Sequence, residues 1–464
     1  MIITSKHQNI IITILVLLGS FCYLSLIFNN NLWMDEAFSA VLVRNSFFDV
    51  LKESAADTLP PLYNIINKIL TSMFGYHSYI LKLSSVLPMI GCLILGATLV
   101  KKHFGFETSL LYIICMTGMP YLFYYGVEIR MYSLSLFFTT ACGIFAFDYF
   151  KTNTGSSFLM YILFGLLAGY THHFAFVSVG FIYLFLLISF ILTNRKRIVD
   201  WILSLFMIGI LYLPCLFITI AQMKRVNGYF EMPEITPSFV FKCLRYPFVT
   251  TYTPLSLLLL LLFLSAPLYC AFHTKKVKSL LPGILGPSIY IGVLIFGSLA
   301  SLVFSGNIFS ERYLVPSLGL FWLGFSVLFK DCKKRILIPL FLFLFLITSR
   351  NYILQFQAEY QPGVTEMTNY FNEHISDDDG YLIYEDNYQI EICFRYYFPW
   401  FKKYDIQNMN DIKGTIWYLA VPGFESQLSG SQFDHYEKDF IDDFHFDRYS
   451  FKLYRLTPNS ISHK

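Results

Sequence analysis

The sequence is poor in charged residues. Asp, Glu, Lys and Arg together make up 14% of its 464 residues, whereas 55% are hydrophobic and 19% are aromatic. With a mean hydropathy of +0.54, this composition excludes an ordinary soluble globular protein and is typical of a chain embedded in a bilayer. The formal net charge of +3 is small, and the basic residues form short scattered clusters, so no nucleic-acid partner is indicated.

The sequence also lacks a cysteine pattern. Its nine cysteines are scattered, mostly within apolar runs, without a C-x-x-C pair or a metal-ligand spacing. We therefore interpret them as small hydrophobic residues rather than as redox or zinc-binding groups.

Long apolar runs fill the first 350 residues. A helix needs about 20 residues to cross the hydrocarbon core, and we predict about 11 such spans. The first run lacks a small-residue cleavage site, so we interpret it as a retained helix rather than a signal peptide. The predicted spans are residues 11–28, 79–100, 107–125, 131–150, 156–171, 173–193, 199–221, 252–272, 280–304, 309–329 and 335–349.

Basic clusters fall on alternate connections between these spans, for example at residues 101–103, 195–197 and 333–335. By the positive-inside rule these connections are cytoplasmic. The sequence therefore predicts a multi-pass protein of the cell (inner) membrane, with a cytoplasmic N-terminus and an extracytoplasmic C-terminal part.

Two segments outside the spans carry structure of their own. In the first external loop, residues 29–78, we predict two interfacial helices, an amphipathic one near 37–53 and a second that starts at Pro60 and Pro61. After residue 350, strand-like runs at 381–384, 415–419 and 449–454 indicate a small α/β domain. The predicted division is thus a membrane domain at 1–350, including the loop 29–78, and an extracytoplasmic domain at 351–464.

Acids and bases gather at the predicted external ends of the spans, while the span interiors hold almost none. Because these segments end at one membrane face, they suit a reaction between a lipid-borne phosphate donor and an acceptor from outside. The groups are Asp35, Glu36, Asp57, Glu128, Arg130, His172, His173, Glu311 and Arg312.

These residue types predict roles in group transfer. Asp35 is the first choice for the general base that takes a proton from an acceptor hydroxyl. Arg130 and Arg312 would stabilise a departing lipid phosphate, with Lys224, Arg225 and Arg245 behind them. Alternatively, a divalent cation held by Asp35, Asp57 and Glu128 would do so, and the sequence leaves this choice open.

Each of these groups also has a purely structural interpretation. Asp35 could cap the following helix, and Asp57 could open the turn before the proline pair. Glu128 and Arg130 could be an interfacial pair that reaches the headgroups. The two histidines could be solvated polar side chains at the turn of a helical hairpin. Arg312 could contact a phosphate headgroup.

Taken together, the segments 33–37 (Trp-Met-Asp-Glu-Ala), 57–63 (Asp-Thr-Leu-Pro-Pro-Leu-Tyr), 128–132 (Glu-Ile-Arg-Met-Tyr) and 312–316 (Arg-Tyr-Leu-Val-Pro) resemble motifs of the GT-C superfamily of membrane glycosyltransferases. The similar branch contains protein O-mannosyltransferases and lipid A aminoarabinose transferases. The resemblance implies a GT-C-like, polytopic α-helical membrane domain, and it covers residues 1–350. Leu59 stands where the mannosyltransferases commonly have His, and the Lys that aminoarabinose transferases have just before the proline pair is missing.

By the same resemblance, Asp35 is the catalytic base or a metal-associated acid, and we group Glu36 and Asp57 with it as catalytic candidates. The metal candidates are Asp35 and Asp57. We assign the remaining motif residues to substrate binding: Pro60, Pro61, Glu128, Arg130, Tyr132, His172, His173, Arg312 and Tyr313.

The predicted activity is that of an inverting glycosyltransferase, for a hexose or a pentose. It would move the sugar from a polyprenyl-phosphate donor to an envelope lipid, glycan or protein at the extracytoplasmic face. The alternative is a transporter or flippase of a lipid-linked glycan. A coupled transporter should carry ionisable residues near the bilayer midplane, and these are missing from the predicted spans. A non-catalytic scaffold would not need the acids and arginines to gather.

Overall fold

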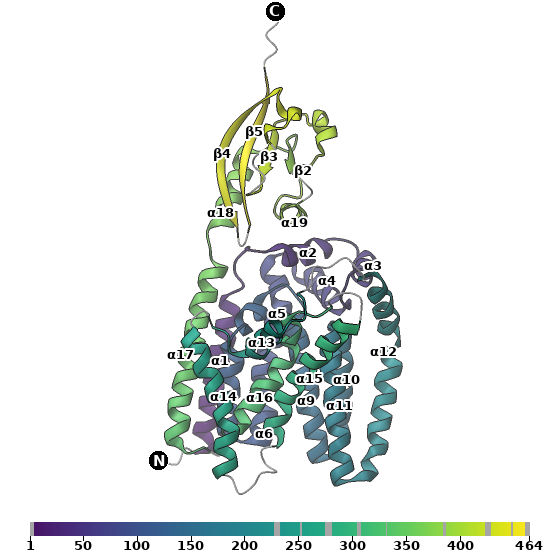
Figure 1. The fold of residues 1–464 in the computed structure, drawn as a ribbon, viewed down its shortest axis with the longest axis vertical. Helices are drawn as coiled ribbons and strands as arrows, with labels where there is room; N and C mark the ends of the chain where they lie inside the picture. Colours follow the sequence, from purple (N-terminus) through teal and green to yellow (C-terminus); the bar gives the residue numbers. More distant parts are fainter. Residues whose placement is uncertain are drawn as a thin grey trace, which may run out of the picture. The chain divides into compact units, whose positions relative to one another are not determined.

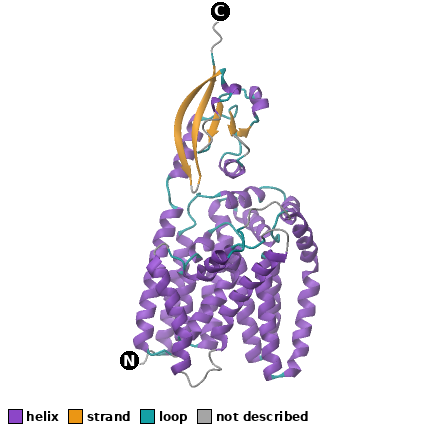
Figure 2. Ribbon diagram, in the orientation of Figure 1, coloured by secondary structure: helices purple, strands orange, loops and turns teal. Residues whose placement is uncertain are grey.

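The structure, a computed structural model, describes residues 4–226, 233–250, 253–273, 281–303, 308–330, 332–383, 387–422, 428–446 and 449–459. Its internal contacts divide the chain into two compact units. The first, which we call the helical unit, consists of Met1–Ile27 and Ser46–Gln355. The second, the α/β unit, consists of Phe28–Asn45 and Phe356–Lys464 and holds the strands (Figure 2).

The helical unit is a bundle of long apolar helices with short helices at their ends (Figure 1). Its helices are α1 (Ser5–Ser25), α3 (Phe47–Ala56), α4 (Leu62–Phe74), α5 (Ser78–Leu95), η1 (Gly96–Val100), α6 (Lys101–Phe104), α7 (Phe106–Gly118), α8 (Leu122–Val127), α9 (Tyr132–Thr152), α10 (Gly155–Thr171), α11 (His173–Thr193), η2 (Arg195–Arg197), α12 (Ile198–Val226), α13 (Pro237–Arg245), η3 (Tyr246–Phe248), α14 (Thr253–His273), α15 (Leu281–Val303), η5 (Glu311–Ser317), α16 (Leu318–Leu328) and α17 (Lys334–Glu359).

The predicted polytopic helical character is confirmed, although the span count differs from the prediction. In the described part of the chain, seven helices are long and apolar enough to cross a membrane, and a bent pair, Pro237–Phe248 with Thr253–Ser265, would add an eighth. The prediction of about 11 included runs that form shorter helices. The run 107–125 breaks after α7, because Pro120 cannot continue the helical hydrogen bonding and Tyr121 adopts a left-handed conformation with φ of 67°.

Close helix contacts fix the position of α16. A Cβ on Gly286 of α15 would lie 2.0 Å from the carbonyl oxygen of Leu320, and a Cβ on Gly324 would lie 2.5 Å from Cδ of Pro287. Small residues let two helix backbones approach in this way. Since η5 leads directly into α16, this crossing also fixes where the segment that contains Arg312 ends.

The basic connections gather at one end of the helical unit. Asp148, near the end of α9, accepts hydrogen bonds from Lys102 Nζ at 2.8 Å and His103 Nε2 at 2.6 Å. Arg197 of η2 donates to the carbonyl oxygens of Tyr149 and Phe150, each at 2.9 Å. The N-terminus and α6 lie at one end of the bundle, and α3 and α4 lie at the other (Figure 1).

The first external loop contains three short helices rather than the two predicted. The expected helix near 37–53 is split into α2 (Met34–Leu42) and α3, because Ser46 starts a new helix by accepting a hydrogen bond from Asp49 N at 3.3 Å. The second predicted helix, α4, begins at Leu62 with Pro61 as its N-cap.

The α/β unit contains a mixed five-stranded sheet with the strand order β2-β1-β3-β5-β4. β1 pairs in parallel with β2 and β3, whereas β5 is antiparallel to β3 and β4. Two of the three predicted strands, at 415–419 and 449–454, are formed, and the third is formed up to residue 383, beyond which residue 384 lies outside the described part. The remaining elements are α2, α18 (Gly363–His374), β1 (Gly380–Ile383), α19 (Tyr388–Tyr397), β2 (Lys402–Lys403), η7 (Ile406–Asp411), β3 (Ile416–Ala420), η9 (Ser431–Phe433), β4 (Tyr436–Phe446) and β5 (Tyr449–Pro458).

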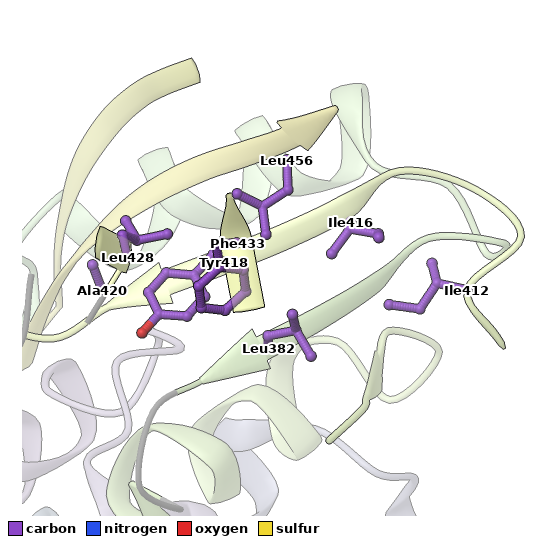
Figure 3. Packing of buried hydrophobic residues seen from close by; sticks show 8 residues of the cluster. All are labelled: Leu382, Ile412, Ile416, Tyr418, Ala420, Leu428, Phe433 and Leu456. Carbon is purple, nitrogen blue, oxygen red and sulfur yellow. The ribbon is translucent and has the colours of Figure 1, made fainter. Parts of the chain in front are cut away.

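Both faces of this sheet are covered. On one face, Leu382, Tyr418 and Leu456 form a buried cluster that is closed by Ile412 and Phe433 (Figure 3). On the other face, ring contacts link the two helices to the strands: Phe371 of α18 lies 5.4 Å from Phe394 of α19, and both rings pack on Phe451 of β5.

The unit boundaries differ from the predicted division at 350/351. The C-terminal boundary lies at 355/356, and the segment Phe28–Asn45, which we assigned to the membrane domain, belongs to the α/β unit. The reason is that hydrogen bonds join this segment to α19: Leu32 N donates to the hydroxyl of Tyr397, and Arg44 donates to the carbonyl oxygen of Tyr396, each at 2.8 Å.

Candidate active site

The turn between α8 and α9 carries the third motif. Ser85 of α5 donates a hydrogen bond from Oγ to the carbonyl oxygen of Glu128 at 2.5 Å and also lies 3.3 Å from that of Arg130. Glu128 is 3% exposed, and Tyr124 donates to its Oε1 at 3.4 Å. A side chain that reaches out to lipid headgroups would not be buried, so this structural interpretation of Glu128 is not supported.

His172 lies at the junction of α10 and α11 and is 1% exposed. Its Nδ1 accepts a hydrogen bond from Phe174 N at 3.1 Å, so the neutral ring carries its proton on Nε2. In the part of the chain that the structure describes, this Nε2 is buried without a hydrogen-bond partner. Burial lowers the pKa of His172 well below its usual value, and the charges of His173, Arg312 and Arg130 lower it further. The ring is therefore a neutral donor with an unused N–H.

Aromatic rings surround this histidine. Tyr132, at the start of α9, and Tyr313, in η5, lie 5.9 Å and 5.1 Å from it between ring centroids. The guanidinium carbon of Arg312 lies 5.9 Å from the Tyr313 ring. Such rings hold the imidazole in place and exclude water from around it.

The charges of the third and fourth motifs act on the same neighbouring tyrosine, Tyr125. Burial raises the pKa of Tyr125, the charge of Glu128 raises it further, and the charge of Arg312 opposes both. Within the helical unit the fold thus brings together six residues that the sequence analysis assigned to substrate binding: Glu128, Arg130, Tyr132, His172, Arg312 and Tyr313.

The second motif lies beside a different histidine. Nε2 of His173 is 3.2 Å from Oε1 of Gln222, whose amide nitrogen donates to the carbonyl oxygen of Leu59 at 2.9 Å. Asp57 ends α3 as its C-cap and accepts a hydrogen bond from Thr58 Oγ1 at 3.4 Å. The following residues, Pro60 and Pro61, are buried. Gln222 therefore links His173 to the turn that holds the second motif, and Asp57 has the turn-forming position that the structural interpretation gave it.

The Asp-Glu pair of the first motif lies in α2, in the α/β unit. Trp33 is the N-cap of this helix, and the side chain of Glu36 accepts a hydrogen bond from Trp33 N at 3.3 Å. Glu36 therefore performs the helix-capping function, as in a capping box. Asp35 is the second residue of the helix and is half-buried, so the interpretation of Asp35 as the N-cap is wrong.

Glu311, another acid of the external ends, forms an ion pair. Its Oε1 lies 2.6 Å from Nζ of Lys242 in α13. Burial acts to raise the pKa of Glu311, but the hydrogen bond and charge of Lys242, with further hydrogen bonds, outweigh it and hold the pKa below its usual value. The pair joins the predicted loop 222–251 to the start of η5. In that loop Arg245 lies over Phe241, Lys224 is exposed, and the side chain of Arg225 lies outside the described part.

The proposed metal cluster gains no support. Among the described residues, no three His, Cys, Asp or Glu side chains are grouped so that they could hold a metal ion. A divalent cation at Asp35 and Asp57 stays a prediction.

Lys82 is the basic residue that the sequence analysis passed over. It lies in the first turns of α5 and is completely buried. Residues three apart share a helix face, so Lys82 lies on the same face as Ser85, which contacts the turn at Glu128 and Arg130. The available signal was a lysine four residues into a predicted span, where a charge is costly and usually functional.

Comparison with known proteins identifies the fold. No protein-family model matches the chain, and no curated protein matches its sequence. The crystal structure of ArnT from Cupriavidus metallidurans in the apo state is similar, with a TM-score of 0.67, 8% identity and coverage of 96% of this chain and 97% of that one. The same protein bound to undecaprenyl phosphate gives a TM-score of 0.62 at 10% identity, with 99% of both chains covered. The chain has the ArnT fold, which confirms the predicted GT-C-like architecture with a small C-terminal sheet domain.

Proposed function

We propose that the chain is a membrane glycosyltransferase that moves a sugar from a polyprenyl-phosphate donor to an envelope acceptor. The main observation behind this proposal is that three segments far apart in the sequence bring together Arg130, Arg312 and the buried N–H of His172. Two guanidinium groups and a neutral N–H donor suit a phosphate group. The ArnT structure that contains undecaprenyl phosphate has the same fold, which supports the choice of a polyprenyl-phosphate ligand.

The arginines and the histidine would act on the leaving group. As the bond between the sugar carbon and the phosphate oxygen breaks, the electron pair and negative charge go to the polyprenyl phosphate. Preorganised cations and N–H groups stabilise such developing charge in a water-poor site. Tyr132 and Tyr313 would shape the pocket around the ligand, and Lys82 is a buried basic side chain on the α5 face that contacts this turn.

Asp35 would act as the general base. Glu36, and not Asp35, makes the capping contact of α2. In the proposed step, a bond forms between the acceptor oxygen and the sugar carbon on the face opposite the phosphate, and the hydroxyl proton passes to Asp35. Attack on the opposite face inverts the anomeric carbon. The sugar, a hexose or a pentose, and the acceptor, a lipid, glycan or protein, are left to the assay.

The proposed orientation places this chemistry outside the cytoplasm. The basic connections at Lys102, His103 and Arg197 lie at the end of the helical unit that holds the N-terminus. By the positive-inside rule that end is cytoplasmic, which supports an extracytoplasmic α3–α4 end and C-terminal domain.

The test is a transfer assay with the purified full chain in lipid nanodiscs. Undecaprenyl-phosphate hexoses and pentoses, labelled in the sugar, are mixed with an envelope extract, and labelled acceptor is measured. We expect transfer by the wild type and a loss of about a hundredfold or more in Asp35→Asn, since a missing general base costs about 10²–10⁴ in rate. Glu366→Gln, which changes an exposed acid of α18, is the matched control.

Two outcomes would contradict the proposal. Equal transfer by wild type and Asp35→Asn would exclude Asp35 as the base. Movement of the labelled lipid between leaflets without transfer to any acceptor would favour the flippase.

A further inference from the structure

The segment that carries Asp35 belongs to the C-terminal part of the chain in space, although it follows the first span in sequence. It forms one compact unit with residues 356–464. We infer that the C-terminal α/β domain holds the helix of the catalytic base, and that Tyr397 and Arg44 are positioning residues for Asp35. This inference rests on the proposed function, because it takes Asp35 to be the base.

Tyr397, the last residue of α19, contacts the backbone directly before α2. Its hydroxyl accepts a hydrogen bond from Leu32 N at 2.8 Å and lies 2.9 Å and 3.1 Å from the carbonyl oxygens of Asn30 and Leu32, to which it can donate. Burial raises the pKa of Tyr397 well above its usual value, so the hydroxyl keeps its proton. One side chain therefore fixes the backbone three residues before Asp35.

Arg44 makes a second contact just beyond the other end of α2. Its Nη1 and Nη2 donate to the carbonyl oxygens of Arg395 and Tyr396, each at 2.8 Å, and its guanidinium carbon lies 5.3 Å from the Tyr396 ring. The last carbonyls of a helix lack intrahelical partners and attract cations. Arg44 thus satisfies the C-terminal end of α19 and binds it to the chain after α2.

Asparagines add to this attachment before the helix. Asn31 Nδ2 donates to the carbonyl oxygens of Glu359 and Gln361 at 2.8 Å and 3.0 Å, and Asn29 Nδ2 donates to Oε2 of Glu359 at 3.1 Å. Tyr396 donates from its hydroxyl to Oδ1 of Asn30 at 2.7 Å. The three consecutive asparagines are therefore used within the α/β unit.

Asp35 lies between these two sets of contacts, in a helix of nine residues whose inner face is buried. A short helix held at both ends keeps the position that these contacts give it. Arg130, His172 and Arg312, the proposed phosphate-binding residues, take no part in the contacts named here. The inference therefore separates two effects: weakening the α2 attachment should slow the chemical step while leaving donor binding nearly unchanged.

The experiment compares Tyr397→Phe, Arg44→Met and the double variant with the wild type, in the full chain in nanodiscs and with the sugar donor that gives turnover. kcat and KM for the donor are measured, together with binding of undecaprenyl phosphate. We expect kcat of the double variant to fall about ten- to hundredfold, the loss typical of a catalytic group displaced by about 1 Å. KM and undecaprenyl-phosphate affinity should stay within about threefold, and Arg44→Lys should regain part of the rate.

Arg395→Met, which changes an exposed side chain of the same helix α19, is the matched control and should behave as the wild type. Hydrogen exchange of the amides of residues 34–42 checks that the double variant loosens α2 without unfolding the chain. Tyr397→Phe removes a single hydroxyl and serves as the milder variant if the double one unfolds.

The inference is overturned if amide exchange in α2 rises while kcat stays within twofold of the wild type. It is also overturned if donor affinity falls as much as kcat. A fully active Asp35→Asn would instead refute the proposed base, and the two failures are thereby distinguished.

Discussion

A backbone amide determines which ring nitrogen of neutral His172 carries the proton. Because Phe174 N donates to Nδ1, the ring can offer only a donor at Nε2 while it is neutral, and its lowered pKa keeps it neutral near pH 7. A charged imidazole beside Arg130 and Arg312 would be repelled by both guanidinium groups. The site therefore gains a hydrogen-bond donor without a third repelling charge.

Two substitutions separate the two nitrogens of His172. The asparagine of His172→Asn can replace the Nδ1 acceptor but not the Nε2 donor, whereas the amide nitrogen of His172→Gln lies near the position of Nε2. We expect His172→Asn to lower kcat/KM for the donor by about tenfold or more, because a hydrogen bond to a charged group contributes about 1.5–3 kcal/mol. His172→Gln should lose less.

The pH profile gives a second readout for the same residue. Since the pKa of His172 lies well below its usual value, wild-type kcat/KM should show no loss from this group between about pH 6 and 8, the range around an ordinary histidine pKa.

Equal donor kinetics in His172→Asn and the wild type would show that the Nε2 proton does not contact the donor.

At the scale of elements, helix ends and helix crossings determine where the motif residues lie. The break at Pro120 and Tyr121 divides an apolar run into α7 and α8, and the next turn places Glu128 and Arg130 near Tyr132. At the other motif, η5 is positioned by α16, which crosses α15 at Gly286 and Gly324.

This crossing predicts the effect of a single methyl group. In Gly286→Ala the new Cβ would lie 2.0 Å from the carbonyl oxygen of Leu320, which is backbone and cannot rotate away. We expect a destabilisation of about 1–3 kcal/mol from overpacking, measured as a lower thermal unfolding midpoint in detergent. The donor KM should rise as well, because η5 carries Arg312.

Gly180→Ala in α11 is the matched control, since a Cβ there has no atom within 4 Å. Alanine is favoured over glycine inside a helix by about 0.5–1 kcal/mol, so this variant should be as stable as the wild type or slightly more so. A Gly286→Ala protein that melts no lower than Gly180→Ala would contradict the close crossing.

At the scale of the whole molecule, the two compact units do not follow the order of the sequence. The α/β unit takes its sheet from the C-terminal region but also α2 from the first external loop. Asp35 belongs to the α/β unit, and Arg130 and Arg312 belong to the helical unit.

The proposed orientation is testable with introduced cysteines. Glu366→Cys in α18 and Lys196→Cys in η2 both replace exposed residues. A membrane-impermeant thiol reagent should label Glu366→Cys in intact cells or spheroplasts and Lys196→Cys only after lysis. Among the described cysteines Cys22 is half-buried and the others are buried, so the wild type provides a low background. The reverse labelling pattern would refute the extracytoplasmic location of the C-terminal domain.

The sequence by itself determined the class of protein and most of its helices. Apolar runs of sufficient length predict helices wherever they occur, because a backbone in lipid must satisfy its own hydrogen bonds. The sequence also indicated the α/β domain, the start of α4 after Pro60 and Pro61, and His172 with five of the residues that lie near it. These predictions depend on local composition and on the face of the membrane at which each segment ends.

Only the tertiary structure decided how these residues are used. It showed that Glu36, and not Asp35, makes the capping contact of α2. It also showed that neutral His172 carries its proton on Nε2 and that Lys82 is completely buried. It also placed α2 with the C-terminal sheet, through contacts between residues more than 300 positions apart, such as Arg44 with Tyr396. Local patterns carry no information about such partners, because a side chain's protonation, burial and role are set by groups that only folding brings next to it.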